Sequence, residues 1–98
     1  MLTLTPIASA KLTPEQSAVR AITTVFGPYA QQALRVAYCE SHYNVWARNG
    51  QYLGLFQMGS YARSRFGHTW DPWGQARAAY RYFVLAGRDW SPWACRPW

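Results

Sequence analysis

The sequence predicts a mainly α-helical domain of about four helices, with a short β-hairpin that forms one lip of a groove. Apolar residues recur at helical spacing in three stretches, and this period disappears between residues 43 and 57. A capping residue followed by proline opens the first and the last of these stretches. The 98 residues fit one domain, which we place at residues 13–98 after a flexible leader, residues 1–12.

The first helix is expected to begin at Thr13. Thr13 provides the cap, Pro14 suits the first helical position, and Gln16 completes a capping box. Glu15 lies in the first turn, where the helix dipole stabilises a carboxylate, so we interpret it as structural. The helix continues to Gly27-Pro28, and its apolar stripe comprises Ala18, Val19, Ile22, Val25 and Phe26.

The second helix is expected over about residues 29–41. At about 100° per residue, Glu40 lies about 20° from Ala33 and about 80° from the centre of the apolar stripe. Glu40 is therefore expected at the rim of the apolar face, whereas Cys39 points away from it. The stripe comprises Ala30, Ala33, Leu34, Ala37 and Tyr38.

The non-helical stretch contains Asn49-Gly50, which is typical of a type I′ turn, and apolar residues flank it. We expect an irregular β-hairpin here. A two-turn helix follows over residues 60–66, with Ser60 as its cap and Gly67 as its end.

The last long helix opens at Asp71-Pro72, where Asp71 is expected to be a cap, and it ends near Gly87. The aromatic segment 89–95 is irregular and is expected to wrap over the helices. The apolar stripe of the last helix comprises Ala76, Ala79, Tyr80 and Phe83.

The net charge of +6 favours anionic partners, which include nucleic acid, membrane surfaces and bacterial wall polymers. The nine arginines are scattered and no nucleic-acid-binding motif is present, so we expect no nucleic-acid partner. No apolar run approaches the roughly 18–20 residues needed to span a bilayer, so no membrane span is expected.

Glu40 is the candidate for acid/base chemistry. Of the four acidic residues, Glu15 and Asp71 have structural interpretations, and Asp89 lies in the distant tail. A carboxyl at the rim of an apolar face loses solvation, which favours the protonated form that a general acid needs. The alternative is a solvated glutamate at a helix end, paired with Arg35 or another arginine.

Three segments in order carry a family resemblance. Cys39-Glu40-Ser41 is followed by Gly-Leu-Phe-Gln at residues 54–57, and a Trp-rich tail ends at Cys95. This arrangement resembles the resuscitation-promoting factor domain of actinobacteria and, more widely, soluble lytic transglycosylases and goose-type lysozymes. The resemblance runs from about residue 34 to residue 95. It implies a lysozyme-like transglycosylase domain that cleaves β-1,4 bonds between N-acetylmuramic acid and N-acetylglucosamine in peptidoglycan.

The resemblance also implies roles for single residues. Glu40 matches the catalytic acid/base, Ser41 the serine that steadies the following loop, and Gln57 the glutamine that faces the sugar or the catalytic carboxyl. Tyr82 falls where the family has a tyrosine near the glutamate, although it lies off the apolar stripe and suits an ordinary surface position equally well. Gln75 stands where the transglycosylase Asp-Pro-x-x-Asn motif has asparagine.

Glycosidases usually use two carboxylates, and this sequence offers no clear second one. The family implies a one-carboxylate route in which the glutamate protonates the glycosidic oxygen. The same group then deprotonates the 6-hydroxyl of muramic acid, which attacks C1 and leaves a 1,6-anhydro end. Attack by water instead would make the enzyme a lysozyme. No cofactor is implied.

The resemblance pairs Cys39 with Cys95 in a disulfide. A disulfide implies an oxidising location, which would be extracellular, associated with the cell wall, or on a virion if a phage encodes the chain. Two alternatives are a metal site that adds His42 and His68, and a cysteine nucleophile with a histidine base. The cysteines and histidines lack compact metal-binding spacing and no local signature supports a nucleophile, so no metal is expected.

The aromatic residues divide between core and groove. We expect Trp90 and Trp93 in the core, and Tyr52 and Tyr61 in the groove, where flat rings pack against sugars. The expected substrate-binding residues are therefore Ser41, Tyr52, Gln57, Tyr61 and Tyr82. The expected partner is a peptidoglycan glycan strand, bound by a monomer. The competing hypothesis is a wall-glycan-binding module without catalysis.

Overall fold

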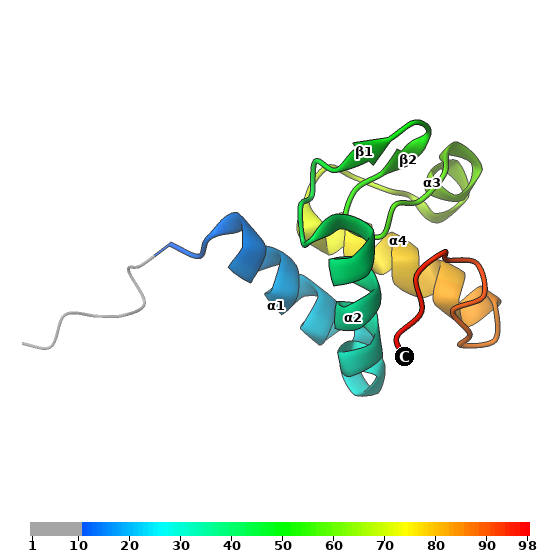
Figure 1. Ribbon diagram of the computed structural model, residues 1–98, viewed down its shortest axis with the longest axis horizontal. Helices are drawn as coiled ribbons and strands as arrows, with labels where there is room; N and C mark the ends of the chain where they lie inside the picture. Colours follow the sequence, from blue (N-terminus) through cyan, green and yellow to red (C-terminus); the bar gives the residue numbers. More distant parts are fainter. Residues whose placement is uncertain (1–10) are drawn as a thin grey trace, which may run out of the picture.

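The computed structural model describes residues 11–98, so most of the predicted leader, residues 1–12, lies outside the described residues. The described chain is mainly helical and carries one small antiparallel sheet, as predicted (Figure 1). Its elements in order are α1 (Pro14–Phe26), the 3₁₀ turn η2 (Gly27–Tyr29), α2 (Ala30–Ser41), β1 (Arg48–Asn49), β2 (Tyr52–Leu53), α3 (Ser60–Phe66) and α4 (Pro72–Leu85).

Helix α1 begins with the predicted capping box. The backbone N–H of Gln16 donates to the Thr13 hydroxyl at 3.1 Å, and the Thr13 N–H donates to the Gln16 side-chain oxygen at 2.9 Å. The helix packs against α2 and α4 through four fully buried residues. These residues are Ala18, Ala21, Ile22 and Phe26.

The buried face of helix α2 is rotated from the predicted one, although Ala33 and Ala37 belong to both. Tyr38 is 53% exposed and packs on the surface against the rings of His42 and Tyr43. The buried residues of this helix are Ala33, Val36, Ala37 and Ser41. At about 100° per residue, the centre of this face lies about 40° from Glu40, half the predicted angle. The carboxylate therefore lies closer to the core side of α2 than its sequence position indicated.

The hairpin turn lies one residue later than predicted. Arg48 pairs with Leu53 and Asn49 pairs with Tyr52, so Gly50 and Gln51 form the turn. Gly50 has a φ of 60° and Gln51 is not in the left-handed region, as in a type II′ turn with glycine at its first central position. The register therefore differs from that of the predicted type I′ turn at Asn49-Gly50.

A buried amide joins this hairpin to α4. The side-chain oxygen of Gln75 accepts a hydrogen bond from the Leu55 N–H at 2.8 Å, and its nitrogen donates to the Val45 carbonyl at 3.1 Å. Asp71 caps α4 as predicted, accepting from the Gly74 N–H at 2.9 Å. The helix therefore holds both ends of the segment that carries the hairpin.

Helix α3 also departs from its predicted start. Its cap is Gly59, and Ser60 is its first residue. The backbone nitrogen and the hydroxyl of Ser60 each lie 3.2 Å from the side-chain oxygen of Gln51, so an amide from the hairpin turn takes the place of the predicted serine cap. Gly67 ends the helix in the left-handed conformation, as predicted.

The C-terminal tail wraps over the helices and returns to α2 (Figure 1, red). Trp90 and Trp93 are buried with exposed fractions of 2% and 4%, which confirms their predicted core positions. The predicted disulfide between Cys39 and Cys95 closes the tail onto α2. None of the helices within residues 11–98 has the length and hydropathy needed to cross a bilayer.

Candidate active site

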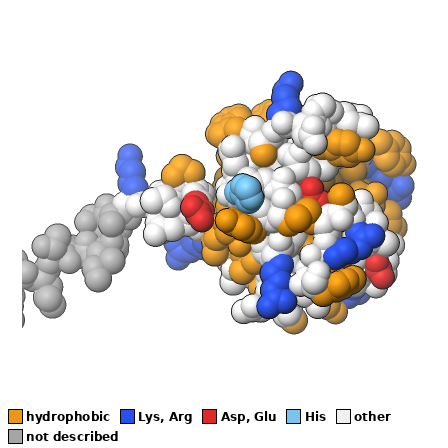
Figure 2. Space-filling model, viewed as in Figure 1, with side chains coloured by type: hydrophobic (Ala, Val, Ile, Leu, Met, Phe, Trp, Pro, Cys, Tyr) orange, Lys and Arg blue, Asp and Glu red, His pale blue; other side chains and the backbone are white. Residues whose placement is uncertain are grey.

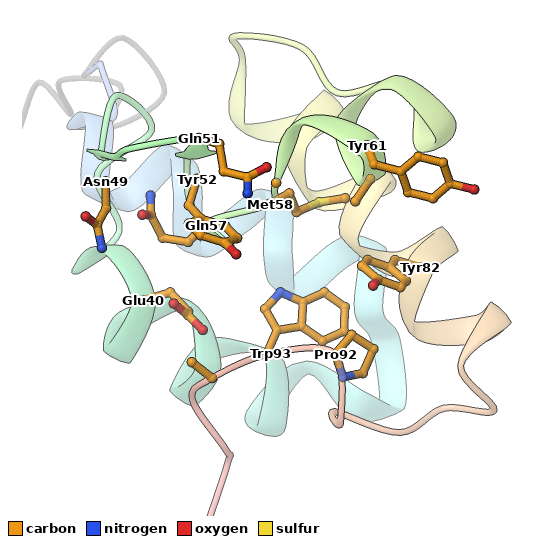
Figure 3. Close-up of a pocket in the computed structure, with 13 residues that line it drawn as sticks. Glu40, Asn49, Gln51, Tyr52, Gln57, Met58, Tyr61, Tyr82, Pro92 and Trp93 are labelled. Carbon is orange, nitrogen blue, oxygen red and sulfur yellow. The ribbon is translucent and has the colours of Figure 1, made fainter.

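A groove of about 490 Å³ runs between the hairpin and the C-terminal tail (Figure 3). Helix α2 contributes Glu40, helix α3 contributes Tyr61 and helix α4 contributes Tyr82. This volume lies within the range of about 300–1,000 Å³ that is typical of ligand sites. The residues that line it are Glu40, Asn49, Gln51, Tyr52, Gln57, Met58, Gly59, Tyr61, Ala62, Tyr82, Pro92, Trp93 and Ala94.

Glu40 lies below the hairpin at one end of the groove, opposite Tyr61 and Tyr82 at the other end (Figure 3). The residue is half-buried, and its Oε2 accepts a hydrogen bond from the backbone N–H of Cys95 at 3.1 Å. Within residues 11–98, its Oε1 has no hydrogen-bond partner. Of the described residues that line the groove, Glu40 alone carries a carboxylate.

Gln57 lies on the hairpin side of the groove, above Glu40 in the view of Figure 3. Its backbone is left-handed, with a φ of 47°. The side-chain nitrogen donates to the carbonyls of Ala47 and Gly54, each at 3.1 Å. These two bonds hold the side chain against the hairpin, and they leave the amide oxygen for a ligand.

The three predicted tyrosines all line the groove. Tyr52 and Tyr61 are 46% and 73% exposed, so their ring faces are accessible to a ligand. Tyr82 is half-buried, and its ring packs between Phe66 and Trp93 at centroid distances of 5.0 and 5.1 Å. Tyr82 is thus part of the groove wall, whereas the other two rings project from it.

Ser41 does not reach the groove. It is buried in α2, and its hydroxyl donates to the Ala37 carbonyl at 2.9 Å. Its own carbonyl accepts from the Asn44 N–H at 3.0 Å, which ties the following loop to the helix end. These contacts suit a residue that steadies the loop, and they include none with the groove.

Several lining residues carried no signal in the sequence. Pro92, Trp93 and Ala94 reach the groove because the disulfide returns the tail to α2, which is a long-range effect. Trp93 has two roles, since its buried indole N–H donates to the Phe56 carbonyl at 3.0 Å while its edge lines the groove. Asn49 and Gln51 line it from the end of β1 and from the hairpin turn.

Two chemical alternatives do not fit the described residues. Cys39 and Cys95 are joined to each other, so neither thiol is free to act as a nucleophile or a metal ligand. Residues 11–98 contain no group of three histidine, cysteine or acidic side chains able to hold a metal ion. His68 lies outside the groove, between α3 and α4, where burial lowers the pKa of its imidazole.

The basic side chains form no single patch on the face drawn in Figure 2, where they appear at well-separated places. On this face, the view shows no continuous basic track. Comparison with protein-family models, with curated proteins and with solved structures finds no significant match. The residues and their geometry are therefore the basis for any functional assignment.

Proposed function

We propose that this protein has a lysozyme-like fold and cleaves the β-1,4 bonds between N-acetylmuramic acid and N-acetylglucosamine in peptidoglycan. The observation that carries the proposal is Glu40, a half-buried carboxylate in a groove that has no second carboxylate among its described lining residues. A two-carboxylate mechanism needs a partner about 5–9.5 Å away, and the lining offers none. The one-carboxylate route suits this site.

In the first step, Glu40 donates a proton from Oε1 to the glycosidic oxygen, and the bond between that oxygen and C1 breaks. The departing sugar leaves with a free 4-hydroxyl. In the second step, the carboxylate takes the proton of the muramic acid 6-hydroxyl, whose oxygen attacks C1. The product carries a 1,6-anhydro end, and Glu40 regains its proton. If water enters in place of the 6-hydroxyl, the product carries a reducing end.

The other groove residues suit glycan binding. The exposed ring faces of Tyr52 and Tyr61 can pack against the C–H faces of pyranose rings, and the amide oxygen of Gln57 can accept a sugar hydroxyl or amide proton. The net charge of +6 favours approach to an anionic wall. The Cys39–Cys95 disulfide is compatible with an extracellular, wall-associated or virion location.

The test compares Glu40→Gln with the parent protein on a suspension of purified peptidoglycan. Removal of the one carboxylate among the described lining residues of the groove should lower the clearing rate by roughly 100-fold or more. Glu15→Gln is the matched control, because Glu15 is an exposed carboxylate in the first turn of α1 and does not line this groove. Equal clearing by the parent and Glu40→Gln would contradict the proposed chemistry.

A second candidate is a wall-glycan-binding module without catalysis, and the lack of a second carboxylate among the described lining residues also favours it. Such a module would use the same aromatic residues to hold a glycan strand. The two candidates differ in one outcome. Tight binding of glycan strands with no release of muropeptides would favour the module, whereas release that depends on Glu40 would favour the enzyme.

A further inference from the structure

Two neighbouring residues of α2 are both joined to Cys95 in the tail. Cys39 is bonded to it through the disulfide, with the Cα atoms 6.0 Å apart. Glu40 accepts a hydrogen bond from the Cys95 backbone N–H at 3.1 Å. The tail therefore reaches the candidate catalytic carboxyl with a main-chain donor, and no side chain of the groove makes such a bond to it among residues 11–98.

We propose that the backbone N–H of Cys95 is a positioning group for Glu40, which holds Oε2 as the unprotonated oxygen and leaves the proton on Oε1. This inference rests on the proposed function and adds to it a main-chain group from the tail. An N–H that donates to one carboxyl oxygen lowers the proton affinity of that atom. The proton then occupies the oxygen without a protein donor, from which the glycosidic oxygen can receive it.

The tail is held in place by contacts other than the disulfide. The indole N–H of Trp90 donates to the Gln32 side-chain oxygen at 2.8 Å, and that of Trp93 donates to the Phe56 carbonyl at 3.0 Å. The guanidinium of Arg35, also on α2, donates to the Pro97 carbonyl at 3.2 Å. These bonds flank Cys95 on both sides along the chain, so its amide can keep its place when the sulfur atoms are not joined.

This arrangement separates two functions of one residue. The disulfide restricts the unfolded chain and so contributes to the stability of the fold. The amide acts on the orientation of Glu40 and on which of its two oxygens carries the proton. Removing the sulfur atoms should therefore cost stability, while the hydrogen bond to Oε2 persists in the folded protein.

The test is a pH titration of the full-length protein labelled with ¹⁵N and ¹³C, followed by NMR. The Cys95 amide proton should move downfield as the Glu40 carboxylate forms, and its midpoint should match that of the Glu40 carboxyl carbon. This shift should vanish in Glu40→Gln. The Cys39→Ala, Cys95→Ala double variant should retain it, because alanine keeps the N–H. An amide at position 95 that does not follow Glu40 in the parent would overturn the proposal, as would a shift that disappears in the double variant while the protein stays folded.

A semisynthetic variant measures the consequence for catalysis. Replacing the amide between Ala94 and Cys95 with an ester removes the N–H and keeps both the side chain and the disulfide. Loss of this donor should lower kcat on a soluble peptidoglycan oligomer by roughly tenfold, with little change in KM. A loosened tail without a positioning role would raise KM as well, because tail residues line the groove, and this result would overturn the inference.

The proposed activity and the positioning contact can fail independently of each other. If the parent protein releases no fragments but the Cys95 amide still follows Glu40, the positioning contact stands and the proposed activity fails. If the parent is active and the amide does not follow Glu40, the activity stands and the positioning fails.

Discussion

A methyl group at Gly54 would lie 2.5 Å from the side-chain oxygen of Gln75. Gly54 also has a φ of 81°, a backbone conformation that side chains rarely adopt. The close approach allows the buried amide of Gln75 to reach the Leu55 N–H and the Val45 carbonyl. The side chain of Gln75 therefore holds the hairpin side of the groove to α4. Only a glycine at position 54 leaves room for this side chain.

The first prediction concerns this contact. Gly54→Ala should lower the free energy of unfolding by roughly 2–4 kcal/mol, because it combines backbone strain with displacement of a buried hydrogen-bonded amide. Gly50→Ala is the matched control, since Gly50 also has a positive φ but a methyl group there would meet no atom within 4 Å. The Gly50→Ala variant should lose about 1 kcal/mol of its free energy of unfolding. Urea unfolding measures both, and equal losses would contradict the role given to Gln75.

The second prediction concerns the disulfide. Cys39 and Cys95 are separated by 56 positions, and a cross-link over a loop of this length is expected to contribute about 4 kcal/mol. The Cys39→Ala, Cys95→Ala double variant should therefore unfold at a much lower urea concentration than the parent. Treating the parent with a reductant should reproduce the loss and leave the double variant unchanged. A reductant effect of equal size in both proteins would show that another process is being measured.

The third prediction concerns the dependence of stability on pH. Burial, and secondarily the charge of Arg63, lowers the pKa of His68 from its usual value of 6.5. The Nε2 atom of this imidazole is buried without a hydrogen-bond partner among the described residues. The unfolded chain therefore binds a proton more readily than the folded protein, so the stabilising effect of the neutral ring is complete above about pH 6.5 and is lost as the pH falls through the folded-state pKa.

His68→Leu removes this titration and keeps an apolar side chain at the position. The fall in Tm between about pH 7.5 and about pH 5 should be smaller in the variant than in the parent. Thermal unfolding followed by circular dichroism at both pH values makes the comparison. A fall of the same size in the two proteins would show that other groups account for the pH dependence.

The fourth prediction concerns glycan binding. Tyr61→Ala removes a ring that lines the groove and is 73% exposed, so it should weaken binding roughly five- to tenfold with little effect on folding. Trp46→Ala is the control, because Trp46 is 66% exposed and is not among the lining residues of this groove. Calorimetric titration with a soluble glycan oligomer measures both. A larger effect from Trp46 would place the binding surface elsewhere.

Local signals explain the parts of the fold that the sequence predicted well. The cap at Thr13, the cap at Asp71 and the helix end at Gly67 each depend on residues within three or four positions, and all three are confirmed. The start of α3 was predicted wrongly because two residues can satisfy the backbone at this helix end. Gly59 rather than Ser60 caps α3, because the Gln51 side chain takes up the Ser60 donors from nine positions away.

In the candidate site, too, residues with a local sequence signal were predicted and those placed by long-range contacts were not. Glu40, Gln57 and Tyr61 were identified from motif order and residue type, and all three line one groove. Ser41 was expected to bind substrate and instead bonds within α2. The Cys95 amide was missed because a backbone donor carries no signature in the sequence, and its place depends on a contact 55 positions away. Long-range packing determines where such backbone donors lie, so the sequence alone does not predict their positions.

The most direct test of the central claim is mass spectrometry of peptidoglycan digested by the parent protein and by Glu40→Gln. We expect muropeptides with 1,6-anhydro ends from the parent, and none from the variant. Reducing ends that depend on Glu40 would retain the acid/base role and replace the 6-hydroxyl with water as the attacking group. Fragments cut in the peptide stems, or identical fragments from both proteins, would contradict the claim that Glu40 cleaves the glycan strand.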